Sequence, residues 1–255
     1  MSAAVEIHPL RTLPEVGAGD GLGGLIAAAA DREEIGMGAG EIVVISQKVV
    51  SKAEGRVRDL AAVAPGAPAR ELAARLAKDA RLVELILGES REVVRAERGV
   101  LITETHHGWI CANAGIDASN VPGPESVVLL PEDPDESARR IRAELREATA
   151  ARAPAVVIAD SFGRPWRLGQ ADVAIGCAGI QPLADWRGRH DREGRELTAT
   201  LVAVADELAA AADLAREKDA GVPVVVIAGL ARHVTADDGP GAAPLRRAEA
   251  DDLFR

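Results

Sequence analysis

The sequence predicts an α+β or irregular α/β fold, because strand-like and helix-like segments mix along it without strict alternation. Short apolar runs rich in β-branched residues, at 41–46, 155–160 and 223–229, are typical of buried strands. Residues 67–88 carry apolar side chains at three- and four-residue spacing, which is typical of a helix. Residues 91–117 alternate short apolar runs with turns, which predicts the strands of a meander or hairpin.

The next elements follow from boundary signals. Gly88 suits the end of the first helix, because glycine is frequent where helices stop. A further strand is predicted at 127–131. Asp133 then caps a helix that has Pro134 at its first position and Glu136 at its third, a combination typical of helix N-termini.

The C-terminal third is expected to contain the longest helix, at about 195–217. One face of this helix gathers the apolar side chains of Leu197, Leu201, Ala205, Leu208 and Ala212. The tail, residues 237–255, starts as a flexible segment. Weak docking of the tail is expected, because its only large apolar residues are Leu245, Leu253 and Phe254.

Length and charge limit the classes of function. The chain has 255 residues, which fits one large domain or two small ones. Its 40 acidic and 30 basic residues argue against a nucleic-acid partner, but not against a nucleotide substrate, since a divalent cation on carboxylates offsets phosphate charge. No apolar run approaches about 18 uncharged residues, so no membrane span is expected. The N-terminus lacks a signal-sequence pattern, and a cytoplasmic protein is expected.

The metal-binding residue types show no zinc pattern. Cys111 and Cys177 lie far apart and form no C-x-x-C pair, so a zinc site is not expected, while a single disulfide between them stays open. His106 and His107 are adjacent, and neighbouring side chains diverge on a strand. A turn or surface role is therefore favoured for the two histidines over a shared metal.

A glycine run at 17–24 contains the pattern G-x-G-x-x-G followed by an apolar helix. A dinucleotide-binding loop also needs a strand directly before it and an acidic residue at the end of the next strand. Here TLPEV precedes the run, and Glu41 lies at the start of the next strand. The run is thus a poor match to a dinucleotide site, and the sequence also lacks the G-x-x-x-x-G-K-[ST] pattern of a P-loop.

Polar segments after predicted strands are the candidate binding elements. SQKVVSK (46–52) is either a solvated strand end or a phosphate site, in which lysines supply positive charge and amide groups donate hydrogen bonds. AGIDASN (114–120) places Asp117 and Asn120 in a turn after an apolar strand. An Asx turn explains one of these two residues but not both.

The segment DSFGRPWRLGQADVAIG (160–176) follows a buried strand and concentrates charge. It offers a carboxylate, a hydroxyl and two guanidinium groups: Asp160, Ser161, Arg164 and Arg167. With Asp117, this set suits a metal-bound polyphosphate, because hard divalent cations take carboxylate and hydroxyl oxygens and arginine binds phosphate or carboxylate oxygens in pairs. On chemistry alone, a structural role for these charges also stays open.

Together these stretches resemble one family, the coenzyme F420-0:L-glutamate ligases, also called coenzyme F420 γ-glutamyl ligases. The matching segments cover nearly the whole chain in the family's order, and several are long and unusual. They are LPEVGAGD (13–20), EIVVISQKVVSKAEGRV (41–57), RGVLITETHHGWICANAGIDASNV (98–121), DSFGRPWRLGQADVAIGCAGI (160–180), ELTATLVAVADELAAAADLA (196–215) and DDLFR (251–255).

The resemblance implies a GTP-dependent ligase that adds L-glutamate to the terminal carboxylate of the deazaflavin precursor coenzyme F420-0 and releases GDP and phosphate. It implies Mg²⁺ or Mn²⁺, as two ions, with help from K⁺, and GTP as co-substrate. It also implies an unusual α+β fold in an intertwined homodimer. Residues 1–255 are expected to form one ligase unit, without the nitroreductase-like domain that follows in some relatives.

The resemblance assigns site residues by matching position. Asp117 and Asp160 would share one metal, and Ser161 would meet the second through its hydroxyl. The nucleotide would contact Leu13, Pro14, Glu15, Val16, Gln47, Lys52, Asn120, Arg216, Glu217, Lys218, Asp219, Ala220, Gly221, Val222 and Pro223.

Three residue roles are less determined. Relatives often read Gly-Gln or Gly-Lys where this chain has Glu217-Lys218, and protonated Lys218 cannot ligate a metal as glutamine can, so the ligands of the second metal stay open. Arg164 or Arg167 is expected to be catalytic, by orienting a carboxylate or stabilising the transferring phosphoryl group. Trp166 is expected to wedge its loop against the core rather than to line the deazaflavin pocket.

Alternative functions remain open at this point. The main alternative is another nucleotide-dependent ligase or phosphotransferase that uses the same scaffold with a different carboxylate acceptor. A non-catalytic nucleotide-binding regulator is supported only by the divergent loop at 216–219, and an oxidoreductase only by the glycine run. The number of glutamates added, the form of the precursor and the preference between Mg²⁺ and Mn²⁺ are not determined by the sequence.

Overall fold

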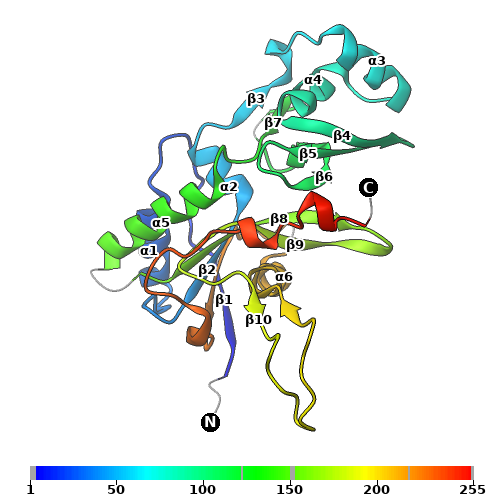
Figure 1. Ribbon diagram of the computed structural model, residues 1–255. Coiled ribbons are helices and arrows are strands. Elements are labelled where there is room, and N and C mark those ends of the chain that lie inside the picture. Colours follow the sequence, from blue (N-terminus) through cyan, green and yellow to red (C-terminus); the bar gives the residue numbers. More distant parts are fainter. Residues whose placement is uncertain (1–3, 122, 150–152, 218, 254–255) are drawn as a thin grey trace.

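The largest unit is a five-stranded mixed sheet, seen in a computed structural model that describes residues 4–121, 123–149, 153–217 and 219–253. The strand order is β1-β12-β2-β8-β9, and within it only β2 and β8 run parallel. Strands and helices mix as the sequence predicts, which confirms an α+β fold (Figure 1). The strands span Glu6–Leu10 (β1), Ile42–Ser46 (β2), Ala155–Arg164 (β8), Arg167–Ala178 (β9) and Val224–Ala228 (β12).

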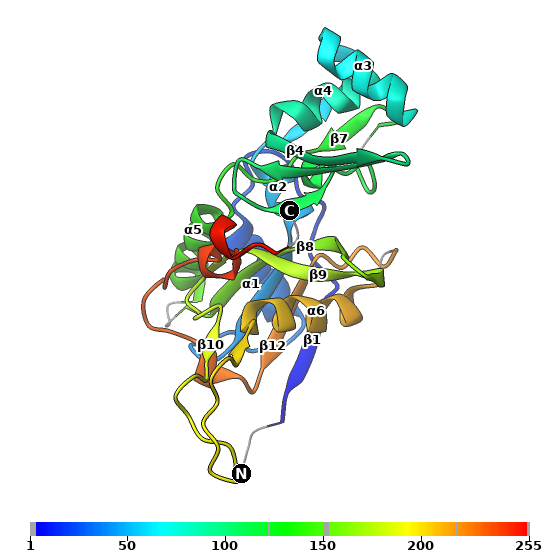
Figure 2. The same ribbon diagram turned by 45° about the vertical axis from the view of Figure 1, so that its right-hand side comes forward.

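Helices cover both faces of this sheet (Figure 2). Val43 and Ile45 of β2 face one helical layer, whereas Ile42 and Val44 face the other. Because its strands are buried on both faces, the central sheet requires continuous apolar runs, and this explains the three runs in the sequence. The first layer contains α1 (Leu22–Arg32), α2 (Gln47–Ala53) and α5 (Pro134–Thr149), and the second contains α6 (Val204–Arg216).

Residues 57–128 form a smaller unit at the top of Figure 1, which we call the small lobe; the sheet with its helices is the large lobe. The small lobe has a hydrophobic core of its own, which includes Val83, Ile86 and Leu101. Its elements are β3 (Val57–Asp59), α3 (Ala67–Leu76), α4 (Ala80–Gly88), β4 (Ser90–Glu97), β5 (Val100–Thr105), β6 (Ile110–Ala112) and β7 (Ser126–Val128). β4, β5 and β6 form the predicted antiparallel meander.

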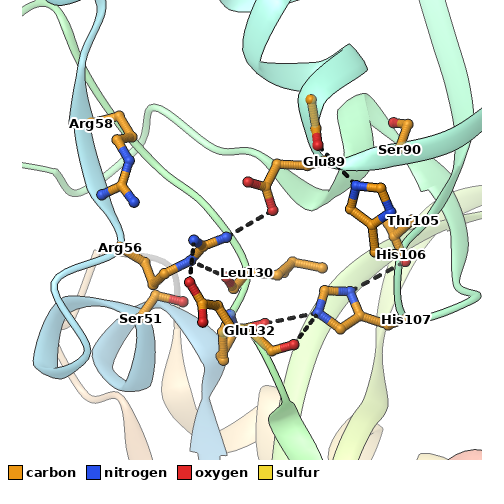
Figure 3. Close-up of polar contacts among 12 residues, drawn as sticks. Ser51, Arg56, Arg58, Glu89, Ser90, Thr105, His106, His107, Leu130 and Glu132 are labelled. Atoms are coloured by element: carbon orange, nitrogen blue, oxygen red, sulfur yellow. Dashed lines mark hydrogen bonds and ion pairs between the residues drawn. The ribbon is translucent and has the colours of Figure 1, made fainter.

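Arg56 joins the two lobes (Figure 3). The chain enters the small lobe just after Arg56 and returns through residues 129–133. The buried guanidinium donates to the Leu130 carbonyl at 2.9 Å, to Glu132 at 3.1 Å and to Glu89 of the small lobe at 2.7 Å. One side chain therefore ties both connecting segments to the end of α4.

The two histidines lie in the turn between β5 and β6, as predicted (Figure 3). His107 Nε2 lies 2.9 Å from the Pro131 carbonyl oxygen and 3.0 Å from that of Glu132. Two carbonyl oxygens require a donor, so Nε2 carries a proton. His106 Nε2 contacts the Gly88 carbonyl at 2.9 Å, and the histidines thus fasten the small lobe rather than share a metal.

Several predicted boundaries are wrong. The segment 67–88 forms two helices, because Ala77 is left-handed (φ 52°) and Asp79 caps a new helix through the Arg81 N–H at 2.8 Å. The end at Gly88 is confirmed. The strand predicted at 127–131 is shorter, ending at Val128. The Asp133 cap is confirmed, since its Oδ1 accepts from the backbone N–H of Glu136 at 2.9 Å.

The prediction of the longest helix is also wrong. α6 begins only at Val204, and residues 195–203 belong to an arm that leads back to β11 (Leu201–Val202), which pairs with β10 (Ala184–Asp185). This arm projects from the body of the molecule at the bottom of Figure 1. Among the described helices α5 is the longest, with 16 residues.

The glycine run serves helix packing. A Cβ on Gly23 would come within 2.3 Å of the Glu144 Cβ, so glycine allows α1 to lie close against α5. The run does not directly follow a strand, since residues 11–21 separate β1 from α1, and the dinucleotide interpretation is not supported. Cys111 and Cys177 are buried free thiols, so the disulfide is excluded. No helix within the described ranges is both apolar and long enough to cross a membrane.

Candidate functional site

A cavity of about 1130 Å³ opens between the lobes. The large lobe lines it with residues 13–16, α2, the outer parts of β8 and β9, and the loop after α6, while the small lobe contributes residues from 111 to 121. Most of the predicted site residues meet here: Leu13, Pro14, Glu15, Val16, Lys52, Asp117, Asn120, Asp160, Ser161, Arg216, Glu217, Asp219, Gly221, Val222 and Pro223. Gln47, Ala220, Arg164 and Arg167 do not line the cavity, and Lys218 lies outside the described residues.

Asp160 and Ser161 lie within a long antiparallel hairpin. β8 continues past them to Arg164 and returns as β9, so the charged segment is regular structure rather than an irregular loop. Ser161 faces Asp172 across the hairpin, and its hydroxyl donates to Asp172 Oδ1 at 2.6 Å. The second aspartate of the segment thereby joins the site.

The carboxyl group of Asp160 has an unusual electrostatic environment. Burial raises its pKa to about 7, although the backbone N–H of Ser161 opposes this shift. The negative charges of Asp172 and Asp117 raise the pKa further. Three carboxylates from both lobes therefore act on one another, and a bound cation would relieve their repulsion.

Asp117 differs, because it already has a cationic partner. Its Oδ2 lies 2.7 Å from Lys48 Nζ, and its Oδ1 accepts from the backbone N–H of Ser119 at 2.7 Å. Burial raises the pKa of Asp117, but the hydrogen bonds from Lys48 and Ser119 outweigh this and hold the pKa below its ordinary value. Asp117 is therefore ionised at neutral pH.

α2 begins directly after β2 and carries two lysines to the cavity. Lys48 and Lys52 are four residues apart and so share a helix face. Lys52 Nζ lies 2.7 Å from Glu15 Oε1, which is mostly exposed. Gln47 is fully buried on the inner side, where its Oε1 accepts from Ser51 at 2.9 Å and its Nε2 has no partner among the described residues.

The loop after α6 forms another wall of the cavity. Arg216 ends the helix and makes a buried ion pair with Asp172. Glu217 follows with a positive φ of 53°, a conformation that L-residues rarely adopt and that glycine adopts without strain. Gly221, Val222 and Pro223 then lead into β12 along the cavity.

The two arginines predicted to be catalytic lie at the tip of the hairpin, away from this cavity. Arg164 donates to the carbonyls of Leu168 at 2.7 Å and Gly169 at 3.3 Å, and it pairs with Arg167 in the strand register. Their catalytic role stays a prediction. Trp166 has a φ of 57° and 79 % of its surface exposed, so the preferred wedge against the core is wrong.

Sequence reasoning missed Lys48 and Asp172. Lys48 had a detectable signal, since it precedes Lys52 by one helical turn in a segment already singled out. Asp172 is found only through the strand register that sets it opposite Ser161. Asn113, directly after β6, also lines the cavity and has a buried Oδ1 without a partner among the described residues.

The donors present fit a divalent cation of the Mg²⁺ type. Asp117, Asp160 and Ser161 offer oxygen atoms only, and the crowded carboxylates around Asp160 favour a positive charge. Within the described residues, no three His, Cys, Asp or Glu side chains gather closely enough to hold a metal alone. The set thus fits an ion that takes further ligands from substrate phosphates, which is how Mg²⁺ commonly binds.

Comparisons with known proteins identify the family. A family model described as F420-0:Gamma-glutamyl ligase matches residues 11–229. A protein of Methanothermobacter thermautotrophicus named Coenzyme F420:L-glutamate ligase is 46% identical over 98% of this chain and 99% of its own length. Proteins of the same name from Methanopyrus kandleri (44% identical, 98% of both chains) and Halobacterium salinarum (45% identical, 95% of this chain and 92% of its own) are similar throughout. The chain belongs to the F420-0:gamma-glutamyl ligase family.

Proposed function

We propose that this protein is a GTP-dependent ligase that joins L-glutamate to the terminal carboxylate of coenzyme F420-0. The observation that carries the proposal is the cavity that Asp117 of one lobe lines together with Asp160, Ser161 and Lys52 of the other. Full-length similarity to proteins named Coenzyme F420:L-glutamate ligase supports the two substrates. Addition of further γ-linked glutamates belongs to the same proposal.

The reaction must activate a carboxylate, because an amine does not displace its oxygen in water. A carboxylate oxygen of the precursor attacks the γ-phosphorus of GTP, the bond to the β-phosphate oxygen breaks, and GDP leaves. The α-amine of glutamate then attacks the carbonyl carbon of the acyl phosphate, phosphate leaves, and the nitrogen loses a proton. The two half-reactions form one amide and release GDP and phosphate.

The residues act mainly by binding and orienting charge. Mg²⁺ or Mn²⁺ would supply positive charge to the phosphates when bound. Asp117 and Asp160 would hold one ion and Ser161 a second, and K⁺ would assist. Lys52 would bind phosphate oxygens after leaving Glu15, a partner that is mostly exposed and therefore easily replaced.

A direct assay tests this function. The protein is incubated with coenzyme F420-0, GTP, Mn²⁺ and L-glutamate, and mass spectrometry is used to look for the addition of one glutamyl unit. Parallel reactions with ATP and with other carboxylate acceptors test each substrate. Product with another acceptor alone would indicate a different ligase, and GTP binding without GDP release would indicate a regulator.

Lys52→Met is expected to raise the KM for GTP about 10- to 100-fold, because a charge-assisted hydrogen bond contributes about 1.5–3 kcal/mol. The methionine keeps the apolar stem, so the helix should remain folded. Steady-state kinetics at saturating glutamate and precursor measure the change. Arg58→Met is the control, because within the described part of the chain this arginine donates only to the nearby Gly55 and Val57 carbonyls and does not line the cavity. An unchanged KM in Lys52→Met would remove this lysine from the nucleotide site.

A homodimer is part of the proposal. The hairpin tip exposes Trp166 (79 %) and Leu168 (98 %), and large exposed apolar side chains are frequent at subunit contacts. In such a homodimer, the same hairpin tip would carry Arg164 and Arg167 to the partner subunit. Light scattering after size exclusion measures the mass, and Leu168→Glu is expected to weaken the dimer.

A further inference from the structure

A chain of polar contacts links three elements beside the cavity. Ser161 of β8 donates its hydroxyl proton to Asp172 Oδ1 of β9 at 2.6 Å. Asp172 Oδ2 accepts from Arg216 Nη2 at the end of α6. All three residues line the cavity, and the side chains of Asp172 and Arg216 are only 5% and 6% exposed. Nothing in the reaction described above requires Asp172 itself to touch a substrate.

We propose that Asp172 is a positioning residue of the ligase reaction, which holds the Ser161 hydroxyl and the Arg216 guanidinium in the orientations that metal–nucleotide binding needs. The inference rests on the proposed function. It adds a residue that acts through two others and that resemblance to the family does not assign.

The first argument concerns the hydroxyl of Ser161. A hydroxyl has one proton and two acceptor positions. Because the proton goes to Asp172, the oxygen serves any further partner as an acceptor. A metal ion requires this orientation, since a hydroxyl ligand must present a lone pair rather than its proton. Such outer partners commonly orient the groups that bind metals.

The second argument concerns Arg216. Its Nη2 is held by Asp172, while its buried Nη1 has no hydrogen-bond partner among the described residues. A buried charged donor without a partner is costly, and such a group calls for an explanation. A phosphate or carboxylate oxygen in the cavity would satisfy Nη1, while Asp172 keeps the guanidinium from turning.

The test measures metal binding, not only turnover. Mn²⁺ is titrated into the protein with GDP present and followed by electron paramagnetic resonance. Asp172→Asn should weaken Mn²⁺ binding about 10- to 100-fold, the usual effect of losing an outer partner. Its amide cannot accept from both Ser161 and Arg216 as the carboxylate does. Ser161→Ala should cause a loss no larger than that of Asp172→Asn, because Arg216 stays held, and the double variant should lose no more than Asp172→Asn alone.

Asp206→Asn is the matched control. Asp206 also joins α6 to β9, because its Oδ1 accepts from the Ala174 N–H at 2.9 Å, but it does not line the cavity. Burial raises the pKa of Asp206, so an uncharged amide should be tolerated there. Mn²⁺ affinity within about twofold of the wild type is expected, well below the outer-partner effect.

The outcomes distinguish a failure of the positioning role of Asp172 from a failure of the proposed ligase function. Wild-type Mn²⁺ affinity in Asp172→Asn, or losses that multiply in the double variant, would overturn the positioning role alone. A wild-type protein that binds no Mn²⁺ with GDP would overturn the proposed function and the positioning role together. If Asp172→Asn does not fold, Asp172→Asn with Arg216→Gln removes both charges. When Ser161→Ala is added to that double variant, the Mn²⁺ affinity should not change. A further tenfold loss of Mn²⁺ affinity would overturn the proposal.

Discussion

Asp160→Asn is expected to reduce glutamate addition by more than about 100-fold, since even outer partners of metal sites contribute 10- to 100-fold. Asparagine has the same shape but lacks the negative charge that would hold a divalent cation. The charges of Asp117 and Asp172 also raise the pKa of Asp160, so these carboxyl groups interact electrostatically with it. Both metal-dependent GTP binding and turnover should fall together.

The fold should survive this change. In the cation-free protein, burial and two neighbouring carboxylates disfavour the ionised form of Asp160. Removing that charge relieves repulsion, so thermal unfolding should occur at the same temperature as in the wild type or at a higher one. Loss of function with retained or increased stability is typical of a site residue.

Turnover by mass spectrometry and unfolding by circular dichroism, on the same preparation, check the prediction. Asp206→Asn makes the same chemical change at a carboxyl group outside the cavity and should keep wild-type turnover. Full turnover in Asp160→Asn would show that the metal assignment is wrong. Lower turnover with a large drop in the unfolding temperature would point to a structural role instead.

The central sheet was predictable because its signal is local. Strands buried on both faces need unbroken apolar runs, and the three runs were found where the sheet lies. The longest helix was not predictable in the same way. Leu197 and Leu201 continue the apolar spacing of α6 by coincidence, while their backbone follows the β10–β11 arm. Spacing alone cannot locate the boundary at Val204.

The residues of the candidate site also differ in whether a local sequence signal predicts them. Asp117 and Asp160 stand out because carboxylates follow apolar strands in the sequence, and the structure brings both to one cavity. Asp172 has no such signal, since its role depends on a register that pairs it with Ser161 across a hairpin. Arg216 was assigned to the nucleotide by position, but only the fold reveals its ion pair. Local sequence patterns do not determine which distant segments of the chain pair with one another.

The C-terminal tail shows the same limit and leads to the second large effect. Composition predicted weak docking, yet Ala242 is fully buried, and its N–H donates to Asp135 at 2.8 Å. Arg142 of α5, with 3% of its side chain exposed, donates to the carbonyls of Thr235 at 2.8 Å and Asp237 at 2.9 Å and pairs with Asp238 at 2.6 Å. The tail, with Thr235 just before it, therefore docks through polar groups as well as through Ala242 and Leu245, which pack on the hydrophobic core. A count of large apolar residues does not detect the polar contacts.

Arg142→Met is expected to lower the free energy of unfolding by about 1.5–3 kcal/mol, because the buried guanidinium makes charge-assisted hydrogen bonds to partly buried oxygen atoms that methionine cannot replace. Methionine retains an apolar stem, so the loss reflects the guanidinium rather than a cavity. Urea unfolding measures the change, and hydrogen exchange should show faster exchange of the Thr235 and Ala242 amides, which are bonded in the wild type.

Arg139→Met is the control on the same helix. Arg139 is about one-third exposed and pairs with Glu136 within the helix, a contact that contributes little in water. Its loss should change stability by no more than about 0.5 kcal/mol. If Arg142→Met were as mild as Arg139→Met, the guanidinium would not hold the tail. If only the exchange of the tail amides increased, the tail would be a separately opening unit that α5 restrains without stabilising the whole fold.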